Sequence, residues 1–153
     1  MAHGIRSINN IVDIGNYIMI LTGQPLHMYD MDKLSSKLFI VKDNMEGEFV
    51  ALDEVKHDLI AGDLTVNIGE DHVGCLAGVM GSRSTMIDEN TKNVVIEAAI
   101  FDSTAIRLTS RRLQLISEAS QRYVRGLDVN RTEYASSLAA SLLVEYASAK
   151  KVS

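Results

Sequence analysis

The order of the hydrophobic patterns along the chain restricts its fold more than any other feature. Near the N-terminus, apolar residues recur at helical spacing from Ile8 to Met19. Between Leu38 and Phe101 the pattern changes to short apolar runs separated by Gly, Asn and Asp, which is typical of strands and turns. The last third returns to helical spacing. Because helices and strands occupy separate blocks, the sequence predicts an α+β fold with a multi-stranded β core packed between helices.

Capping residues set the expected helix ends. Ser7 is expected to begin the first helix, and Gly23 with Pro25 to end it. In the last third, Asp102 and Ser117 are expected to cap two helices that precede a longer one at about 129–150.

Strands are expected in five runs, with turns at 46–48 and 61–63. These runs are LFIVK (38–42), FVALD (49–53), DLTVNI (63–68), VGCLAGVM (73–80) and VVIEAAIF (94–101).

Charge and cysteine content exclude several classes of protein. A net charge of -5 argues against a domain that binds nucleic acid through bulk electrostatics alone. The single cysteine, Cys75, rules out a disulfide within the chain and favours a cytoplasmic location, and it is expected to be a small buried residue. No apolar run approaches the roughly 18 residues of a membrane span, so no membrane partner is expected.

Arginines gather in one late stretch of the chain. This stretch contains only two acidic residues, so it is either a solvated helix face with ion pairs or a contact surface for RNA or a partner subunit. The arginines are Arg107, Arg111, Arg112, Arg122, Arg125 and Arg131.

Familiar catalytic signatures are missing from the sequence. It contains no P-loop, no GxSxG and no HExxH. His3, His57 and His72 lack ligand-like spacing, and we expect them to be exposed loop residues, so no metal site is predicted.

Three features could nevertheless carry chemistry. Pro25, the only proline, fixes the backbone beside His27 in an expected turn, although it could simply end the helix. Glu97 interrupts an apolar run and is either a buried, partnered carboxylate or a solvent-facing residue. LAGVMG (76–81) contains glycines that would let the backbone approach a ligand closely, or form an ordinary tight turn.

Six motifs together resemble one family, the central editing domain in the beta subunit of bacterial phenylalanyl-tRNA synthetase. The resemblance extends from about Arg6 to beyond Asp128, and that family's fold is α+β, with strands packed between helices. In order, the motifs are RSINNIVDIGNY, GQPLHMYD, LAGVMG, IEAAIFD, IRLTSRR and SEASQRYVRGLD.

The resemblance implies an editing hydrolase that removes tyrosine from mischarged tRNA. Asn16 and His27 would orient the attacking water or the ester as catalytic residues, and Glu97 would recognise the tyrosine hydroxyl. Gly78 would present its backbone to that hydroxyl, while Gly81 and Ala119 would shape the pocket.

The same resemblance implies partners and cofactors. The parent enzyme joins phenylalanine to tRNA with ATP and Mg²⁺, which act outside this domain, in a tetramer with alpha subunits. This domain, residues 1–153, would be a piece of the longer beta subunit and would need no cofactor or metal of its own. Its partners would be the tyrosine-bearing tRNA 3′ end and the alpha subunit, and not DNA.

Several residues depart from the family pattern. Gly15 stands where threonine is common, and Ser117 also replaces a threonine. Met28-Tyr29 replaces the commoner Ala-Phe, and Gly81-Ser82 replaces a frequent Gly-Gly pair. Gly15 removes a polar contact that could help hold the water, so a second function is retained: a non-catalytic module that contacts tRNA or packs between subunits.

Overall fold

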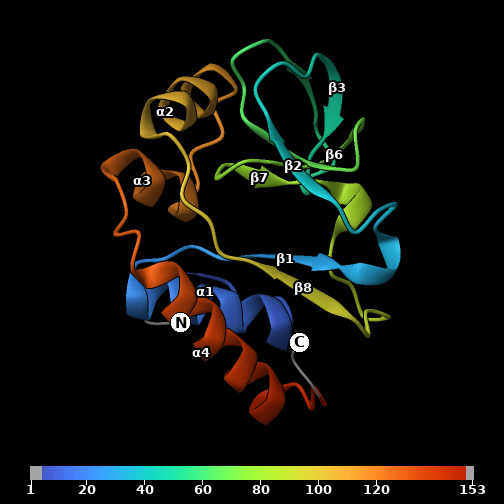
Figure 1. The fold of residues 1–153 in the computed structure, drawn as a ribbon, viewed down its shortest axis with the longest axis vertical. Helices are drawn as coiled ribbons and strands as arrows, with labels where there is room; N and C mark the ends of the chain where they lie inside the picture. Colours follow the sequence, from blue (N-terminus) through green and yellow to red (C-terminus); the bar gives the residue numbers. More distant parts are fainter. Residues whose placement is uncertain (1–4, 151–153) are drawn as a thin grey trace.

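Three layers make up residues 5–150, the part of the chain that the computed structural model describes. Helices α1 and α4 form one layer, the strand pair β1–β8 lies against them, and the remaining strands with α2 and α3 lie beyond it (Figure 1). The arrangement confirms the predicted α+β fold class. No helix among these residues is long and apolar enough to cross a membrane.

The strands form three antiparallel sheets. One pair joins β1 (His27–Asp30) to β8 (Val94–Glu97), and another joins β3 (Gly47–Val50) to β4 (Lys56–Leu59). The largest sheet has the order β2-β5-β6-β7, in which the strands are β2 (Phe39–Lys42), β5 (Thr65–Ile68), β6 (His72–Leu76) and β7 (Met80–Gly81). Two short 3₁₀ helices, η1 (Met31–Lys33) and η2 (Arg83–Thr85), follow β1 and β7.

Side-chain caps fix the N-terminal ends of three helices. The helices are α1 (Asn10–Thr22), α2 (Ser103–Arg112), α3 (Glu118–Arg125) and α4 (Arg131–Tyr146). The predicted caps of α2 and α3 are confirmed, because Asp102 accepts from the Ala105 N–H and Ser117 from the Ser120 N–H. The predicted cap of α1 is wrong. Asn9 accepts from the Val12 N–H instead, while the Ser7 hydroxyl donates to Asp13.

The end of α1 and the extent of α4 follow from backbone geometry. Gly23 ends α1 in the left-handed region, at φ 80°, and its N–H donates to the Met19 carbonyl, as expected for a C-cap glycine. The last helix is shorter than predicted. It begins after Asn130, which supplies no side-chain cap bond, and ends at Tyr146, two residues before Ser148 turns to φ 57°.

Strand assignments from the sequence needed four corrections. The segment that begins at His27 was expected to be a turn and is instead strand β1. The turn expected at 46–48 already contains the first two residues of β3. The run at 94–101 pairs only as far as Glu97. Strand β4 was missed because its sequence, KHDL, has the charges of an edge strand and no apolar run.

Two of the histidines expected in exposed loops lie in strands. His57 is half-buried in β4, and His72 begins β6, where Nε2 lies 2.9 Å from the Ser84 hydroxyl. His3 lies outside the described residues.

Alternation along β1 and β8 gives the middle layer two different faces. Met28 and Ile96 pack with Ile14, Ile18 and the alanines of α4 in one cluster. Tyr29 and Val95 face the other way and pack with Val66, Ile68 and Cys75 of the large sheet. Because side chains alternate along a strand, His27 and Glu97 lie on the same face as Tyr29 and Val95.

Candidate functional site

A small pocket lies between the β1–β8 ladder, the β6–β7 turn and helix α3. Its volume is about 70 Å³. Its lining includes five of the six residues that the sequence singled out: His27, Gly78, Gly81, Glu97 and Ala119. Four separate segments of the chain therefore meet at one point, although they are scattered in the sequence.

Strand register brings His27 and Glu97 together. The two residues are direct partners in the antiparallel β1–β8 ladder. Directly opposite residues in such a ladder have Cβ atoms about 4.5–5.5 Å apart on the same face. The backbone pairing therefore fixes an imidazole beside a carboxylate at the pocket wall.

Glu97 is half-buried and partnered, which decides between the two alternatives that its sequence left open. The Tyr29 hydroxyl donates to Glu97 Oε2, and Tyr29 Oη lies 3.2 Å from Cys75 Sγ. Burial raises the pKa of Glu97, while the hydrogen bond from Tyr29 lowers it. No described residue donates to Oε1, so this oxygen can accept from a ligand hydroxyl.

Cys75 is buried and chemically quiet, as predicted. Its side chain is 3% exposed, and burial raises the pKa of its thiol well above the usual value. Cys75 also lines the pocket. Because a nucleophilic cysteine needs its thiolate form, this protonated thiol contributes to the pocket wall and not to the chemistry.

The His27 ring packs closely against two residues, Tyr29 and Gly81. It meets the edge of Tyr29, with ring centroids 4.4 Å apart at 88°. A Cβ placed on Gly81 would lie 2.5 Å from His27 Cε1, so only glycine leaves room for the imidazole. Burial lowers the pKa of His27 to about 4, so the ring is neutral at physiological pH.

One ring nitrogen of His27 has no partner in the described chain. Nε2 is buried and makes no hydrogen bond with any residue in the range 5–150. Nitrogen atoms buried in this way usually have a protein or water partner. A neutral imidazole that lines a small pocket and has an unpaired nitrogen is suited to hold a water molecule.

The LAGVMG motif forms the turn opposite the ladder. Gly78 has φ 65°, and a Cβ there would lie 2.8 Å from Tyr123 Cδ2, so glycine is required for both conformation and space. Within residues 5–150 the Gly78 N–H makes no hydrogen bond. Helix α3 closes this side with Ala119 and Tyr123, which lie one turn apart.

Asn16 is the predicted site residue that does not line the pocket. It is half-buried on α1. The neighbouring Gly15 packs against Met28, with its missing Cβ position 3.5 Å from Met28 Cε. Met28 lies on the face of β1 opposite to His27. Helix α1, which carries Asn16, therefore packs against the face of the β1–β8 ladder that is turned away from the pocket.

Sequence reasoning missed three residues that complete the pocket. Tyr29 holds Glu97 from outside the lining, while Tyr123 and the long side chain of Met80 line the pocket. Tyr29 could have been found if the run after Pro25 had been assigned to a strand, since it lies two positions from His27. Tyr123 follows Ala119 at helical spacing, which was also visible in the sequence.

The described residues offer no metal centre. Between residues 5 and 150, no group of three or more His, Cys, Asp or Glu side chains is placed to hold a metal ion.

The buried imidazole predicts a specific pH dependence of stability. Because the pKa of His27 falls from 6.5 to about 4 on folding, the unfolded chain binds this proton more readily, and stability decreases as the pH falls through that range. We expect the wild type to lose about 2–3 kcal/mol more than His27→Gln between pH 7 and pH 4.5, measured by urea unfolding. Glu97, whose pKa shifts upward, acts in the opposite direction in both proteins and so cancels in the comparison. Equal losses would contradict a buried neutral ring.

Comparisons with known proteins match the chain to one domain family and to one kind of relative. A family model described as the B3/4 domain matches residues 1–148. The phenylalanine–tRNA ligase beta subunit of Streptococcus thermophilus (strain CNRZ 1066) is 44% identical over 148 residues, which is 96% of this chain and 18% of that protein. The beta subunit of Staphylococcus aureus (strain bovine RF122 / ET3-1) is 45% identical over the same shares. The chain thus spans about a fifth of the length of these curated relatives.

Proposed function

Since the chain belongs to the B3/4 domain family, we propose that it is an editing domain that hydrolyses the ester between tyrosine and tRNA. The observation that carries this proposal is the pocket itself, which gathers His27, Gly78 and Glu97 around one small space. The relatives are parts of a phenylalanine–tRNA ligase. An enzyme of that kind must separate two amino acids that differ by a single hydroxyl.

Glu97 is proposed to recognise that hydroxyl. Its Oε2 is held by Tyr29, which leaves Oε1 to accept a hydrogen bond from the phenol of a bound tyrosyl group. The free N–H of Gly78 can donate to the same phenol oxygen. A phenylalanyl group would leave both polar groups buried and unpaired, which is the arrangement that rejects an analogue most strongly.

His27 is proposed to position the attacking water. The water oxygen attacks the ester carbonyl carbon, the bond to the terminal ribose oxygen breaks, and the proton passes to that leaving oxygen. A ring whose pKa is about 4 is a weak base at neutral pH, so it acts as an acceptor that orients the water. An aminoacyl ester is already activated, and orientation of the water alone accelerates its hydrolysis.

Entry of a substrate requires the pocket to widen. A volume of about 70 Å³ holds little more than water, whereas pockets for larger ligands begin at roughly 300 Å³. Met80 lines the pocket, and its unbranched thioether side chain changes rotamer at low cost.

The function is tested by single-turnover deacylation with excess protein. We expect the chain to hydrolyse tyrosyl-tRNA at least about 100-fold faster than phenylalanyl-tRNA, since the missing hydroxyl leaves Glu97 unpaired. His27→Gln, which removes the imidazole but keeps a polar side chain, is expected to slow tyrosyl-tRNA hydrolysis by about 100-fold. If neither ester is hydrolysed above the buffer rate, the chain is instead a module that contacts tRNA or packs between subunits.

A further inference from the structure

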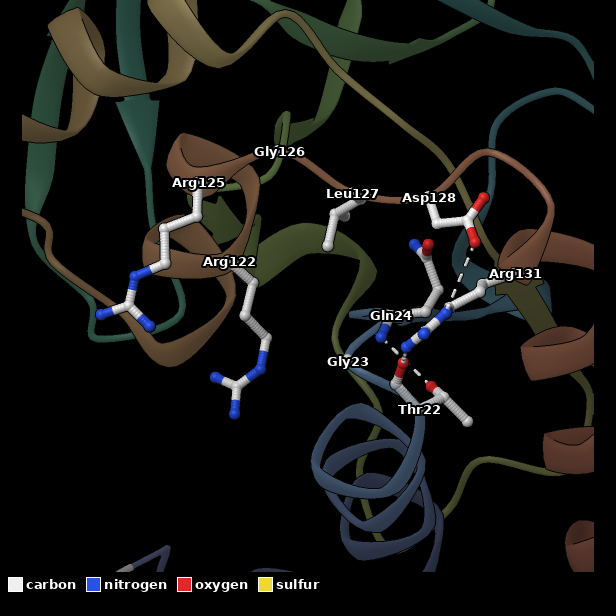
Figure 2. A pocket seen from close by; sticks show the side chains of 9 residues that line it. All are labelled: Thr22, Gly23, Gln24, Arg122, Arg125, Gly126, Leu127, Asp128 and Arg131. Atoms are coloured by element: carbon white, nitrogen blue, oxygen red, sulfur yellow. Dashed lines mark hydrogen bonds and ion pairs between the residues drawn. The ribbon is translucent and has the colours of Figure 1, made fainter.

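A second, larger pocket lies beside the first, on the other side of helix α3. Its volume is about 340 Å³. The end of α1, the last turn of α3 and the segment leading into α4 surround it (Figure 2). Its lining includes Gln24, Arg122, Arg125, Leu127, Asp128 and Arg131.

Positive charge dominates this pocket. Arg122, Arg125 and Arg131 line it, with Asp128 as the single acidic lining residue. In Figure 2, Arg122 extends from α3 toward the end of α1, and Arg125 lies beside it at the outer edge. Within the described chain Arg125 makes no ion pair, so its full charge faces solvent.

The other two arginines are held in place by the fold. Arg131 Nη1 donates to the Thr22 carbonyl at 2.5 Å, and its Nε lies 3.7 Å from Asp128 Oδ2. Arg122 Nη1 contacts its own helix at Glu118, 2.6 Å from Oε2, where the partner carboxylate is exposed. These contacts fix the guanidinium groups but leave N–H donors free, because each guanidinium carries five.

The two pockets share a wall. Helix α3 contributes Ala119 and Tyr123 to the first pocket and Arg122 to the second. Gln24 Nε2 of the second pocket and Tyr123 Oη of the first both donate to the Ala99 carbonyl, at 2.9 Å and 3.2 Å, so one backbone group links the linings of the two pockets. A ligand bound in the first pocket therefore has the arginine pocket as its near neighbour.

Gln24 adds a polar group to this region. Since both partners of Nε2 are carbonyl oxygens, which only accept, the orientation of the amide is fixed. Its Oε1 is buried and has no hydrogen-bond partner within residues 5–150. An acceptor of this kind gains a partner when a ligand that carries a donor group settles nearby.

From this juxtaposition we infer that the arginine pocket binds the phosphate backbone of the single-stranded RNA that carries the ester. The inference rests on the proposed function, because the ester in the first pocket is the end of that strand. Guanidinium groups bind phosphates through paired hydrogen bonds, and a flexible RNA end offers phosphates at short intervals. The pocket would thereby hold the strand next to its hydrolysed end.

A purely structural role for these arginines makes a different prediction. Basic residues in the last turn of a helix stabilise its negative end, and Arg122 and Arg125 occupy that position in α3. If that were their only role, replacing them would lower thermal stability without changing the affinity for RNA.

The test measures binding of a fluorescent RNA hexanucleotide with the sequence of a tRNA 3′ end. The wild-type chain is compared with the double variant Arg122→Ala/Arg125→Ala and with a matched control, Arg107→Ala/Arg111→Ala. The control removes the same charge from exposed positions on α2, outside both pockets. Circular dichroism confirms that each protein is folded.

We expect weak binding by the wild type, about 10-fold weaker binding by the pocket variant, and a change of less than about 2-fold in the control. Loss of two phosphate contacts should reduce the slope of log affinity against log salt by about 1.4, which is roughly 0.7 for each contact on a single strand. Equal losses in both double variants would overturn the inference, because they would show attraction by net charge alone. Binding of a hexaglutamate peptide with the same dependence on Arg122 and Arg125 would also overturn it, in favour of an acidic protein partner.

Hydrolysis of tyrosyl-tRNA by the wild type is measured separately, so the proposed hydrolysis and the proposed RNA site can each be contradicted without the other. If binding depends on the arginine pocket but no ester is hydrolysed, the proposed function fails and the RNA site stands. If the ester is hydrolysed but the pocket variant binds RNA as the wild type does, the RNA site fails and the proposed function stands.

Discussion

Replacing Glu97 with alanine is expected to reduce the preference for tyrosyl-tRNA over phenylalanyl-tRNA by about 100-fold or more. The carboxylate is the acidic group in the pocket, and its Oε1 is the acceptor that a phenol would reach. Without it, the tyrosine hydroxyl would enter a buried site with one fewer partner, whereas phenylalanine would no longer leave a carboxylate unpaired. Both changes act against tyrosine, so the preference should fall further than the rate of ester hydrolysis itself. Single-turnover deacylation of both tRNAs measures the two quantities together.

Tyr29→Phe is the matched control for this prediction. It removes the hydroxyl that donates to Glu97 Oε2 but keeps the aromatic ring against His27 and the carboxylate in the pocket. We expect most of the preference for tyrosine to survive, with a loss of about 10-fold or less, because a single hydrogen bond to a charged group contributes about 1.5–3 kcal/mol and acts here only indirectly. If Glu97→Ala left the preference unchanged, Glu97 would have no role in recognition, whatever Tyr29→Phe did.

Local signals in the sequence predicted the helices well. Asp102 and Ser117 were identified as caps because a capping side chain bonds to a backbone N–H only three residues away. Gly23 was identified for a similar reason, since a left-handed C-cap favours glycine. The cap of α1 was misplaced because Ser7 and Asn9 are both good capping residues. Which of them caps the helix depends on contacts in the folded chain, where Ser7 bonds to Asp13 instead.

Long-range pairing explains what the sequence did not predict. Strand β1 is four residues long, and it is a strand only because β8, far along the chain, pairs with it. That pairing determines the register in which His27 meets Glu97 and places Tyr29 next to Cys75. The motifs therefore identified most of the pocket residues without revealing that Tyr29 already occupies one oxygen of Glu97.

Replacing Gly81 with alanine is expected to disable the pocket through His27. The new Cβ would lie 2.5 Å from His27 Cε1 and 2.9 Å from Leu52 Cδ1. Leu52 can move because the contact is with the end of its side chain, but the imidazole already packs against the Tyr29 ring. The ring must turn away, and a displacement of about 1 Å in a positioning group costs roughly 100-fold in rate. Overpacking of this kind also destabilises a fold by about 1–3 kcal/mol.

Gly15→Ala is the control that separates the clash with His27 from any general effect of replacing a glycine with alanine. A Cβ at Gly15 would meet only Met28 Cε, at 3.5 Å, which is ordinary van der Waals contact. Because Gly15 lies inside α1, alanine there should stabilise the chain by about 0.5–1 kcal/mol and leave deacylation within about 2-fold of wild type. Urea unfolding and single-turnover deacylation of tyrosyl-tRNA, run on both variants, measure the contrast. Because the clash at Gly81 acts on a single ring, a Gly81→Ala protein that kept its full rate would show that His27 need not occupy this position for the ester to be hydrolysed.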